Sequence, residues 1–247
     1  MDSLQLEENR IQQAYGRRSS DDARYSFFDE GQLFRIQQLE RAILALLKFH
    51  GLKSLHSRKI LEVGCGSGYW LRQFIQWGAS PEKLTGVDLL DRCVAEANRL
   101  CSSAVNVRRA NAASLDFADG SFDLVFQATV FTSILDPDLK KQIAAEMIRV
   151  TADDGFILWY DFRFNNPWNA DVRGVEAREI RELFPGCDIT LHRVTLAPPL
   201  ARRLARYSWL GCCLLDKIPW LCTHYLGLVR KRPMPHAPRR LAKYAHQ

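Results

Sequence analysis

The chain has 247 residues, 47% of them hydrophobic and 25% charged, a composition typical of a soluble globular protein that can bury a sizeable core. Its formal net charge of +6 points toward nucleic acid, but no Asp or Glu follows Asp216, and six cations gather in residues 230–243. Without those six, the 34 basic side chains fall to 28 and match the 28 acidic ones, so we expect no specific nucleic-acid partner.

Hydrophobic spacing predicts strands that alternate with helices. Apolar residues at helical spacing indicate a helix over 29–50, and a short apolar run over 59–63 indicates a buried strand that ends at a glycine cluster. Further strands are expected at 84–88, 105–108, 122–126, 156–160, 189–196 and 224–229. Further helices are expected at 70–78, from a cap at Asp91 to Cys101, at 136–150, at 175–184 and as one long stretch before the last strand. This alternation predicts a parallel sheet covered on both faces, with ligands beyond the carboxyl ends of the strands.

The cysteines and the termini bear on compartment and domain organisation. The seven cysteines form no C-x-x-C pair and lack the spacing of a zinc site, so we expect reduced thiols and no bound metal. The polar, acidic N-terminus matches no secretory signal, and no apolar run of about 18 residues occurs, which favours a cytoplasmic protein. We expect one domain over 1–232 and a basic, flexible tail over 233–247.

A glycine-rich loop follows the first predicted strand. Gly64, Gly66 and Gly68 permit a tight turn and let a ligand approach bare backbone at a helix N-terminus. A dinucleotide fingerprint needs its third glycine one position later, where this chain has Tyr69. Asp88, at the end of the second strand, either accepts hydrogen bonds from ribose hydroxyls or caps the following turn. The pattern favours a nucleoside cofactor, and a nicotinamide-dependent oxidoreductase stays as the alternative.

Three segments, 62–68, 86–88 and 121–125, together resemble the successive motifs of class I S-adenosylmethionine-dependent methyltransferases. The resemblance covers 57–162 and is closest to the small-molecule branch of that family. It implies an α/β, Rossmann-like, doubly wound sheet of seven strands, mostly parallel with the last strand antiparallel, and S-adenosylmethionine as the cofactor. The cofactor-binding positions that it implies are Glu62, Gly64, Cys65, Gly66, Gly68, Asp88, Leu89, Asn111, Ala112 and Gln127.

Two positions qualify this resemblance. Asn111 stands where the family often has an aspartate that bonds the adenine amino group. Its side-chain oxygen can still accept a hydrogen bond, so we expect adenine recognition to persist with the charge lost. Gln127 and Thr129 lie in the loop that faces the sulfonium and the acceptor in this family, and the alternative is that they only cap the strand end.

The N-terminal segment, residues 1–56, resembles the lid that covers the cofactor in related enzymes. Its Tyr15, Arg24 and Tyr25 side chains are candidates to bond the cofactor carboxylate, and a loosely packed surface segment is the alternative.

The acceptor is expected beyond the fifth strand, within residues 163–232. Residues 160–174 interleave polar and aromatic side chains, which suits a polyhydroxylated acceptor such as a sugar. The alternative is structural, with an Arg163–Asp171 ion pair and amides that satisfy turns. The expected acceptor-binding residues are Thr129, Phe131, Arg163, Asn165, Asn166, Trp168 and Arg173.

Residues 199–219 combine apolar side chains with three arginines. Three interpretations of this segment stay open: it covers a hydrophobic pocket, it lies on a membrane surface, or it packs against the sheet or a homodimer partner. The basic tail could also contact a membrane surface. The oligomeric state is open.

Methyl transfer is an in-line displacement in which the protein aligns two reactants, and positioning alone removes about 7–11 kcal/mol of barrier. A hydroxyl acceptor also needs a base, for which Asp161 is the first candidate and His224 the second. We therefore expect O-methylation of a sugar, lipid-linked or natural-product acceptor. A non-catalytic scaffold with the same fold is a further alternative.

Overall fold

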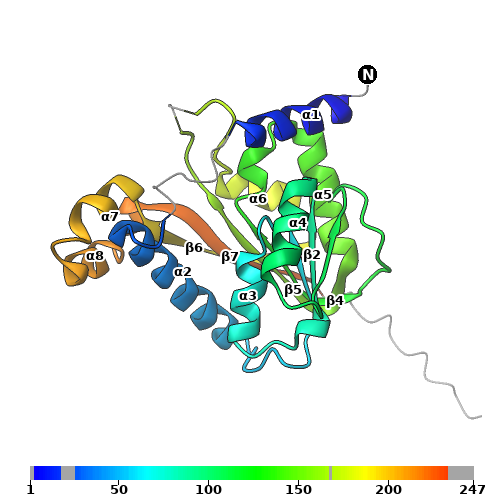
Figure 1. Cartoon of the computed structure of the whole chain (residues 1–247), viewed down its shortest axis with the longest axis horizontal. Helices are drawn as coiled ribbons and strands as arrows, with labels where there is room; N and C mark the ends of the chain where they lie inside the picture. The colour runs from blue at the N-terminus through cyan, green and yellow to red at the C-terminus, as the bar shows by residue number, and fades with distance from the viewer. Residues whose placement is uncertain (1–2, 18–25, 167–168, 233–247) are drawn as a thin grey trace, which may run out of the picture.

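The computed structural model describes residues 3–17, 26–166 and 169–232 and centres on a seven-stranded sheet in the order β3-β2-β1-β4-β5-β7-β6 (Figure 1). The strands are β1 (Ile60–Val63), β2 (Leu84–Asp88), β3 (Asn106–Arg109), β4 (Phe122–Ala128), β5 (Thr151–Phe162), β6 (Cys187–Leu196) and β7 (Cys222–Lys231). Strands β1 to β5 pair in parallel, whereas β7 runs antiparallel to both β5 and β6. The predicted Rossmann-like sheet with an antiparallel last strand is confirmed.

The helices begin where the sequence supplies caps. Asp29 accepts a hydrogen bond from the N–H of Gln32 at 2.7 Å, and Asp136 precedes Pro137 at the first helical position of the next capped helix. The described helices are α1 (Ser3–Gly16), α2 (Glu30–Phe49), α3 (Tyr69–Gln76), α4 (Asp91–Leu100), α5 (Pro137–Val150), α6 (Ala177–Leu183), α7 (Pro198–Leu204) and α8 (Trp209–Leu215). Short 3₁₀ turns are η2 (Pro81–Lys83), η3 (Phe131–Ser133) and η4 (Pro219–Leu221). Among the described helices, none is long and apolar enough to span a bilayer.

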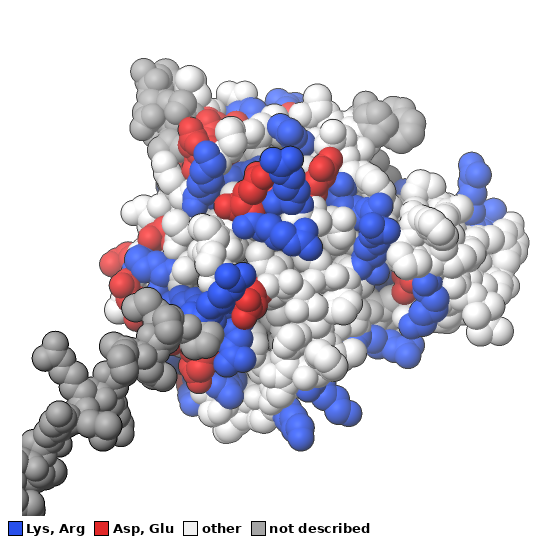
Figure 2. Space-filling view, turned by 180° about the vertical axis from the view of Figure 1, so that it is seen from behind, with Lys and Arg blue, Asp and Glu red and all other residues white. Residues whose placement is uncertain are grey.

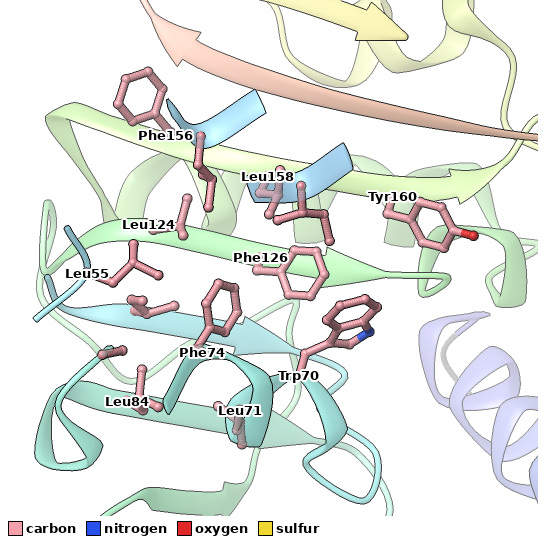
Figure 3. Close-up of a cluster of buried hydrophobic side chains, with 14 of the residues drawn as sticks. Leu55, Trp70, Leu71, Phe74, Leu84, Leu124, Phe126, Phe156, Leu158 and Tyr160 are labelled. Atoms are coloured by element: carbon pink, nitrogen blue, oxygen red, sulfur yellow. The ribbon is translucent and has the colours of Figure 1, made fainter. Parts of the chain in front are cut away.

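Two hydrophobic cores cover the two faces of the sheet. On one face, α2 and α3 pack over β1, β4 and β5, and the aromatic rings of Trp70 and Phe74 each lie 5.6 Å from the ring of Phe126 (Figure 3). On the other face, α5 and α6 pack over the same strands around Trp159. The carboxyl ends of the parallel strands therefore meet at one edge, which α1 crosses (Figure 1).

Several boundaries differ from the sequence predictions for local reasons. Strand β5 begins at Thr151 rather than at the predicted residue 156, and its register with β4 shifts between Phe122 and Leu124. Asp91 is the first residue of α4 rather than its cap, since Leu90 holds the cap position and donates its N–H to Asp88. The remaining differences concern the later helices. Helix α6 is shorter than the predicted 175–184 segment, and the long helical stretch of 199–219 breaks into α7, α8 and η4.

Candidate active site

The glycine loop after β1 forms a cradle of backbone. Gly64, Gly66 and Gly68 have φ values of +69°, +53° and +74°, in the left-handed region that favours glycine. A Cβ at Gly64 would lie 2.5 Å from Cγ2 of Val130, and one at Gly68 would lie 2.6 Å from Sγ of Cys101. A Cβ at Gly66 would meet no atom within 4 Å. The outer glycines are thus required by packing, and the middle one leaves open space for a ligand.

Asp88 ties this cradle to the end of β2. Its carboxylate accepts hydrogen bonds from the N–H groups of Gly66 and Leu90, both at 2.9 Å. Burial raises the pKa of Asp88, and these backbone hydrogen bonds oppose the rise. Asp88 therefore caps the turn, as one interpretation held. Each carboxylate oxygen keeps a second acceptor position, so the ribose role expected for it is compatible with this geometry.

Beneath the loop lie two buried groups of different character. Burial, together with the negative charge of Asp88, raises the pKa of Glu62 well above its ordinary value. One Glu62 carboxylate oxygen is buried and has no hydrogen-bond partner among the described residues. Burial also raises the pKa of the Cys65 thiol, which packs against the backbone of Gly86. Cys65 is thus a small packing residue, and Glu62 keeps one buried oxygen without a donor among the described residues.

Helix α1 lies across the carboxyl edge of the sheet and is fastened at three points. Glu7 accepts from the N–H of Leu135 at 2.5 Å, and Arg10 donates to the carbonyl of Ser133 at 2.6 Å. The hydroxyl of Tyr15 lies 3.0 Å from that of Ser133. Helix α1 thus has the position expected of a lid. Arg24 and Tyr25, expected to share the role of Tyr15, lie outside the described residues.

Asn111 differs from its expected role, because both ends of its amide already have partners. Its oxygen accepts from the N–H of Ala113 at 2.9 Å, and its nitrogen donates to a carboxylate oxygen of Glu8 at 2.5 Å. Glu8 on α1 thereby brings a carboxylate to the position where the resemblance implies an aspartate. A cavity of about 210 Å³ adjoins the ends of α1 and β2, and Leu89 is among its lining residues. Ala112 lies half-buried next to Asn111.

The loop after β4 is built by internal hydrogen bonds. The Gln127 side chain is buried, accepts from the N–H of Val130 at 3.1 Å and donates to the carbonyl of Tyr160 at 3.4 Å, so it stabilises the loop as the alternative held. Thr129 has a φ of +59°, which is rare for a β-branched residue. Phe131 is fully buried against Trp159, with ring centroids 4.6 Å apart. Its expected contact with the acceptor is wrong for this conformation, because its ring belongs to the core.

Asp161 is fully buried and holds this loop rather than facing a cavity. One of its oxygens accepts from the N–H groups of Phe131 at 2.9 Å and Thr132 at 3.3 Å, and the other accepts from Phe162 at 3.0 Å. Burial raises its pKa to about 7, and the hydrogen bonds limit the rise. A buried carboxylate with three backbone donors favours a positioning role over the proton transfer that we expected.

A second polar cluster lies at the same edge, under the N-terminal half of α2. The rings of Tyr160 and His224 stack 4.6 Å apart, and the Tyr160 hydroxyl lies 3.0 Å from that of Thr195. Burial and the charge of Arg35 lower the pKa of His224 well below its ordinary value, so the imidazole is neutral. Its Nδ1 lies 3.0 Å from the Thr223 hydroxyl, whereas Nε2 has no hydrogen-bond partner among the described residues.

The loop after β5 forms a separate cavity. Arg163, Asn165 and Arg173 line a space of about 540 Å³ between this loop, α5 and α6. None of the glycine-loop residues lines it, so these three residues do not share a cavity with the donor site. The carboxylate of Asp171 pairs with Arg17 at 3.0 Å, so the alternative Arg163–Asp171 pair does not form.

Two further residues of that loop were expected to bind the acceptor. The Asn166 carbonyl accepts from the N–H of Asn169 at 3.1 Å, and Trp168 lies outside the described residues.

Sequence reasoning missed residues that are distant in the sequence but lie at the site in the fold. Glu7, Glu8 and Arg10 belong to α1, where the i, i+3 spacing of Glu7 and Arg10 was the available signal. Arg35, Tyr160 and Thr195 carried no local signal, because only the pairing of β5, β6 and β7 under α2 brings them together.

Comparisons with known proteins agree with this architecture. A family model described as a methyltransferase domain matches residues 60–155. The phthiotriol/phenolphthiotriol dimycocerosates methyltransferase 1 of Mycobacterium ulcerans is 30% identical over 136 residues, 52% of this chain and 47% of that protein. The chain spans somewhat less than half the length of the first curated relatives that it matches.

Solved structures share the fold at low identity. A Pyrococcus horikoshii protein superposes with a TM-score of 0.62 at 16% identity, covering 89% of this chain and 99% of that one. An S-adenosylmethionine-dependent methyltransferase from Mesorhizobium loti superposes with a TM-score of 0.54 at 17% identity, covering 75% and 95%. With the glycine cradle and the sheet order, these findings support a class I S-adenosylmethionine-dependent methyltransferase, with the family-model match confined to residues 60–155.

Proposed function

We propose that the protein transfers a methyl group from S-adenosylmethionine to a small-molecule acceptor. The observation that carries this proposal is the glycine cradle, open at Gly66 and tied to Asp88. The methyltransferase name of the mycobacterial relative supports the same reaction for the segment that the two chains share.

The charges around the cradle suit this cofactor. S-adenosylmethionine carries an ammonium and a sulfonium, and the buried Glu62 oxygen without a partner can accept from such a cationic donor. Asp88 and Glu8 add two further carboxylates at the same edge. A dinucleotide would instead bring an anionic pyrophosphate next to these groups, which disfavours the oxidoreductase alternative.

When bound, the cofactor supplies an electrophilic methyl group, and the residues of this chain align the acceptor with it. Asp161 fixes the loop from Thr129 to Thr132 through its backbone hydrogen bonds. Helix α1 covers the edge and excludes water.

We place the acceptor beside Tyr160 and His224 and infer that it is a hydroxyl group of a sugar, lipid-linked or natural-product molecule. Asp161 and His224 are both buried in this conformation, and the Asp161 oxygens already accept three backbone hydrogen bonds, so His224 with its open Nε2 is the candidate base that we test first. The loop after β4 and His224 on β7 are two strand spacings apart, roughly 10 Å. A small acceptor molecule can span this distance between the methyl group and the base. Thr129 and Thr195, the non-glycine residues with positive φ in the described part of the chain, contact Tyr160 at this edge, and such backbone strain clusters at functional sites.

Calorimetry with S-adenosylmethionine and with NAD tests the donor. Binding of NAD without binding of the methyl donor would overturn the proposal. Transfer of labelled methyl to a panel of sugar, phenol and lipid-linked hydroxyl acceptors then tests the reaction. Donor binding without transfer to any acceptor would favour the scaffold alternative.

The variants His224→Asn and Tyr160→Phe test the acceptor site. We expect His224→Asn to lower kcat by about 10²-fold or more, the lower range for a general base, with the donor Kd unchanged. Tyr160→Phe keeps the ring stack and removes only the hydroxyl, so a smaller loss is expected. An unchanged kcat in His224→Asn would exclude it as the base.

A further inference from the structure

The segment 197–221, called the α7–α8 lobe below, projects at one end of the molecule (Figure 1). Its inner side forms a small core of its own, in which Ala201, Cys212 and Leu196 surround Phe34 of α2. The ring of Trp209 meets that of Phe34 edge-on, with centroids 5.1 Å apart. The lobe is therefore anchored on α2 by its inner side, which leaves its outer side free of the fold.

The outer side of the lobe exposes large apolar side chains. Leu210 and Leu214, four residues apart on α8, are 71% and 64% exposed, whereas Cys212 between them is fully buried. Tyr207 and Trp220, in the turns before and after α8, are 73% and 78% exposed. Single exposed apolar residues are ordinary, but four of them within fourteen residues form a group that indicates an interaction surface.

The charge of the lobe is almost entirely positive. Arg203, Arg206 and Lys217 are exposed, and none of them pairs with an acidic side chain in the part of the chain that the structure describes. The acidic residue of the lobe is Asp216, whose carboxylate is used to accept from the N–H of Leu196 at 2.9 Å. In the space-filling view the region at the right is mostly white with blue groups around it and little red (Figure 2).

We propose that the α7–α8 lobe docks the protein on the surface of an anionic phospholipid bilayer. Tryptophan and tyrosine favour the interface between headgroups and acyl chains, leucines enter its apolar side, and basic residues meet the anionic headgroups. No helix has to cross the bilayer for this contact, which agrees with the short helices of the lobe.

A second copy of the chain fits this surface less well. In a two-fold interface the same patch lies on both sides, so Arg203, Arg206 and Lys217 would face their own copies. The described acidic residue of the lobe is Asp216, whose charge acts on Lys217, so Arg203 and Arg206 have no compensating carboxylate within the lobe. Charge complementarity therefore selects an anionic surface over self-association.

Vesicle flotation of the full chain tests the proposal, with neutral phosphatidylcholine vesicles and with vesicles that contain a quarter phosphatidylglycerol. We expect binding to the anionic vesicles and a loss of binding in 0.5 M NaCl, because salt screens exposed charges. The triple variant Leu210→Ser/Leu214→Ser/Trp220→Ser should lower the partition coefficient by at least about tenfold, since each apolar side chain loses its burial. The variant Arg203→Gln/Arg206→Gln/Lys217→Gln should lower it by about fivefold per cation removed.

A matched control is Phe49→Ser/Lys53→Gln, at the other end of α2. Phe49 is 82% exposed and Lys53 is also exposed, and they lie roughly 27 Å along the helix from the lobe contact at Gly31. This control should bind vesicles like the unaltered chain, and circular dichroism should show all variants folded.

All variants keep residues 233–247, so binding that survives in both triple variants would assign the contact to the tail and overturn the proposal. Equal loss in the control would show a nonspecific effect and overturn it too. A concentration-dependent dimer that the apolar variant abolishes, without vesicle binding, would identify a second copy as the occupant and exclude the bilayer.

Discussion

The two halves of the active edge are built in different ways. The donor half consists of backbone, in which three glycines with positive φ are held by Asp88 within a short stretch of sequence. The proposed acceptor half consists of side chains from four elements, in which Arg35 of α2 acts on Tyr160 and His224, and Thr195 contacts Tyr160. Backbone geometry needs particular residue types at fixed spacing, whereas a side-chain cluster needs only the right topology.

This difference leads to separable effects. Changes in the donor half should alter cofactor affinity, and changes in the acceptor half should alter turnover at constant cofactor affinity. Asp161 belongs to neither half alone, because it sits on β5 and holds the loop after β4.

The largest effect is expected for Asp161, through the pH dependence of stability. Its pKa is raised from 3.8 to about 7 in the folded chain, so the unfolded chain releases this proton first as pH rises. The protonated Asp161 therefore contributes fully to the free energy of unfolding below pH 4, and this contribution is lost as the pH rises to 7. At 1.36 kcal/mol per pKa unit, the loss amounts to about 4 kcal/mol. Urea unfolding of Asp161→Asn should therefore show a flatter decline between pH 4 and 7 than the unaltered chain.

The exposed Asp154 supplies the control for that experiment. Asp154→Asn removes a solvent-exposed carboxylate from the same strand, so urea unfolding of this variant should match that of the unaltered chain. Equal slopes for Asp161→Asn and the unaltered chain would show that Asp161 stays ionised in the fold, and its positioning role would need another explanation.

The next effect concerns the donor half alone. Asp88→Ala should weaken S-adenosylmethionine binding by about 1.5–3 kcal/mol, the range for hydrogen bonds to a charged group, as measured by calorimetry. Asp116→Ala, at a fully exposed site, is the control. The comparison between the halves predicts that the acceptor KM at saturating cofactor stays constant. A parallel rise of the acceptor KM would show that the halves are coupled.

The sequence was sufficient for the fold class and for the position of the glycine loop after β1. The glycine spacing, Tyr69 and Asp88 locate the cradle, because each follows from a backbone requirement that one residue type meets. The role of Asn111 was not predictable, since its partner Glu8 is distant in sequence and reaches it only when α1 lies across the edge. Burial could not be read from the sequence either: Phe131 packs into the core, and the carboxylate of Asp161 is taken up by backbone hydrogen bonds.

A smaller effect tests whether Glu8 supplies the carboxylate that position 111 lacks. Glu8→Gln keeps an oxygen that can accept from Asn111 but removes the charge, so cofactor affinity should fall by about 1 kcal/mol. Adding Asn111→Asp to Glu8→Gln should restore it. The single variant Asn111→Asp should instead weaken the contact with α1, because two carboxylates then face each other. Failure of the double variant to recover affinity would remove Glu8 from adenine recognition.

The smallest effect distinguishes the two threonines with positive φ, Thr129 after β4 and Thr195 in β6. The left-handed backbone of Thr129 destabilises the folded chain by about 1–2 kcal/mol. Glycine removes this strain, but its greater conformational entropy in the unfolded chain lowers the free energy of unfolding by about 0.5–1 kcal/mol. Thr129→Gly should therefore raise the free energy of unfolding by up to about 1 kcal/mol. The hydroxyl of Thr195 lies 3.0 Å from that of Tyr160, so Thr195→Gly should lose this contact and gain nothing in stability. If the strained backbone of Thr129 orients the loop after β4 for methyl transfer, Thr129→Gly should lower kcat while stability rises. An unchanged kcat would show that the positive φ of Thr129 has only a structural role.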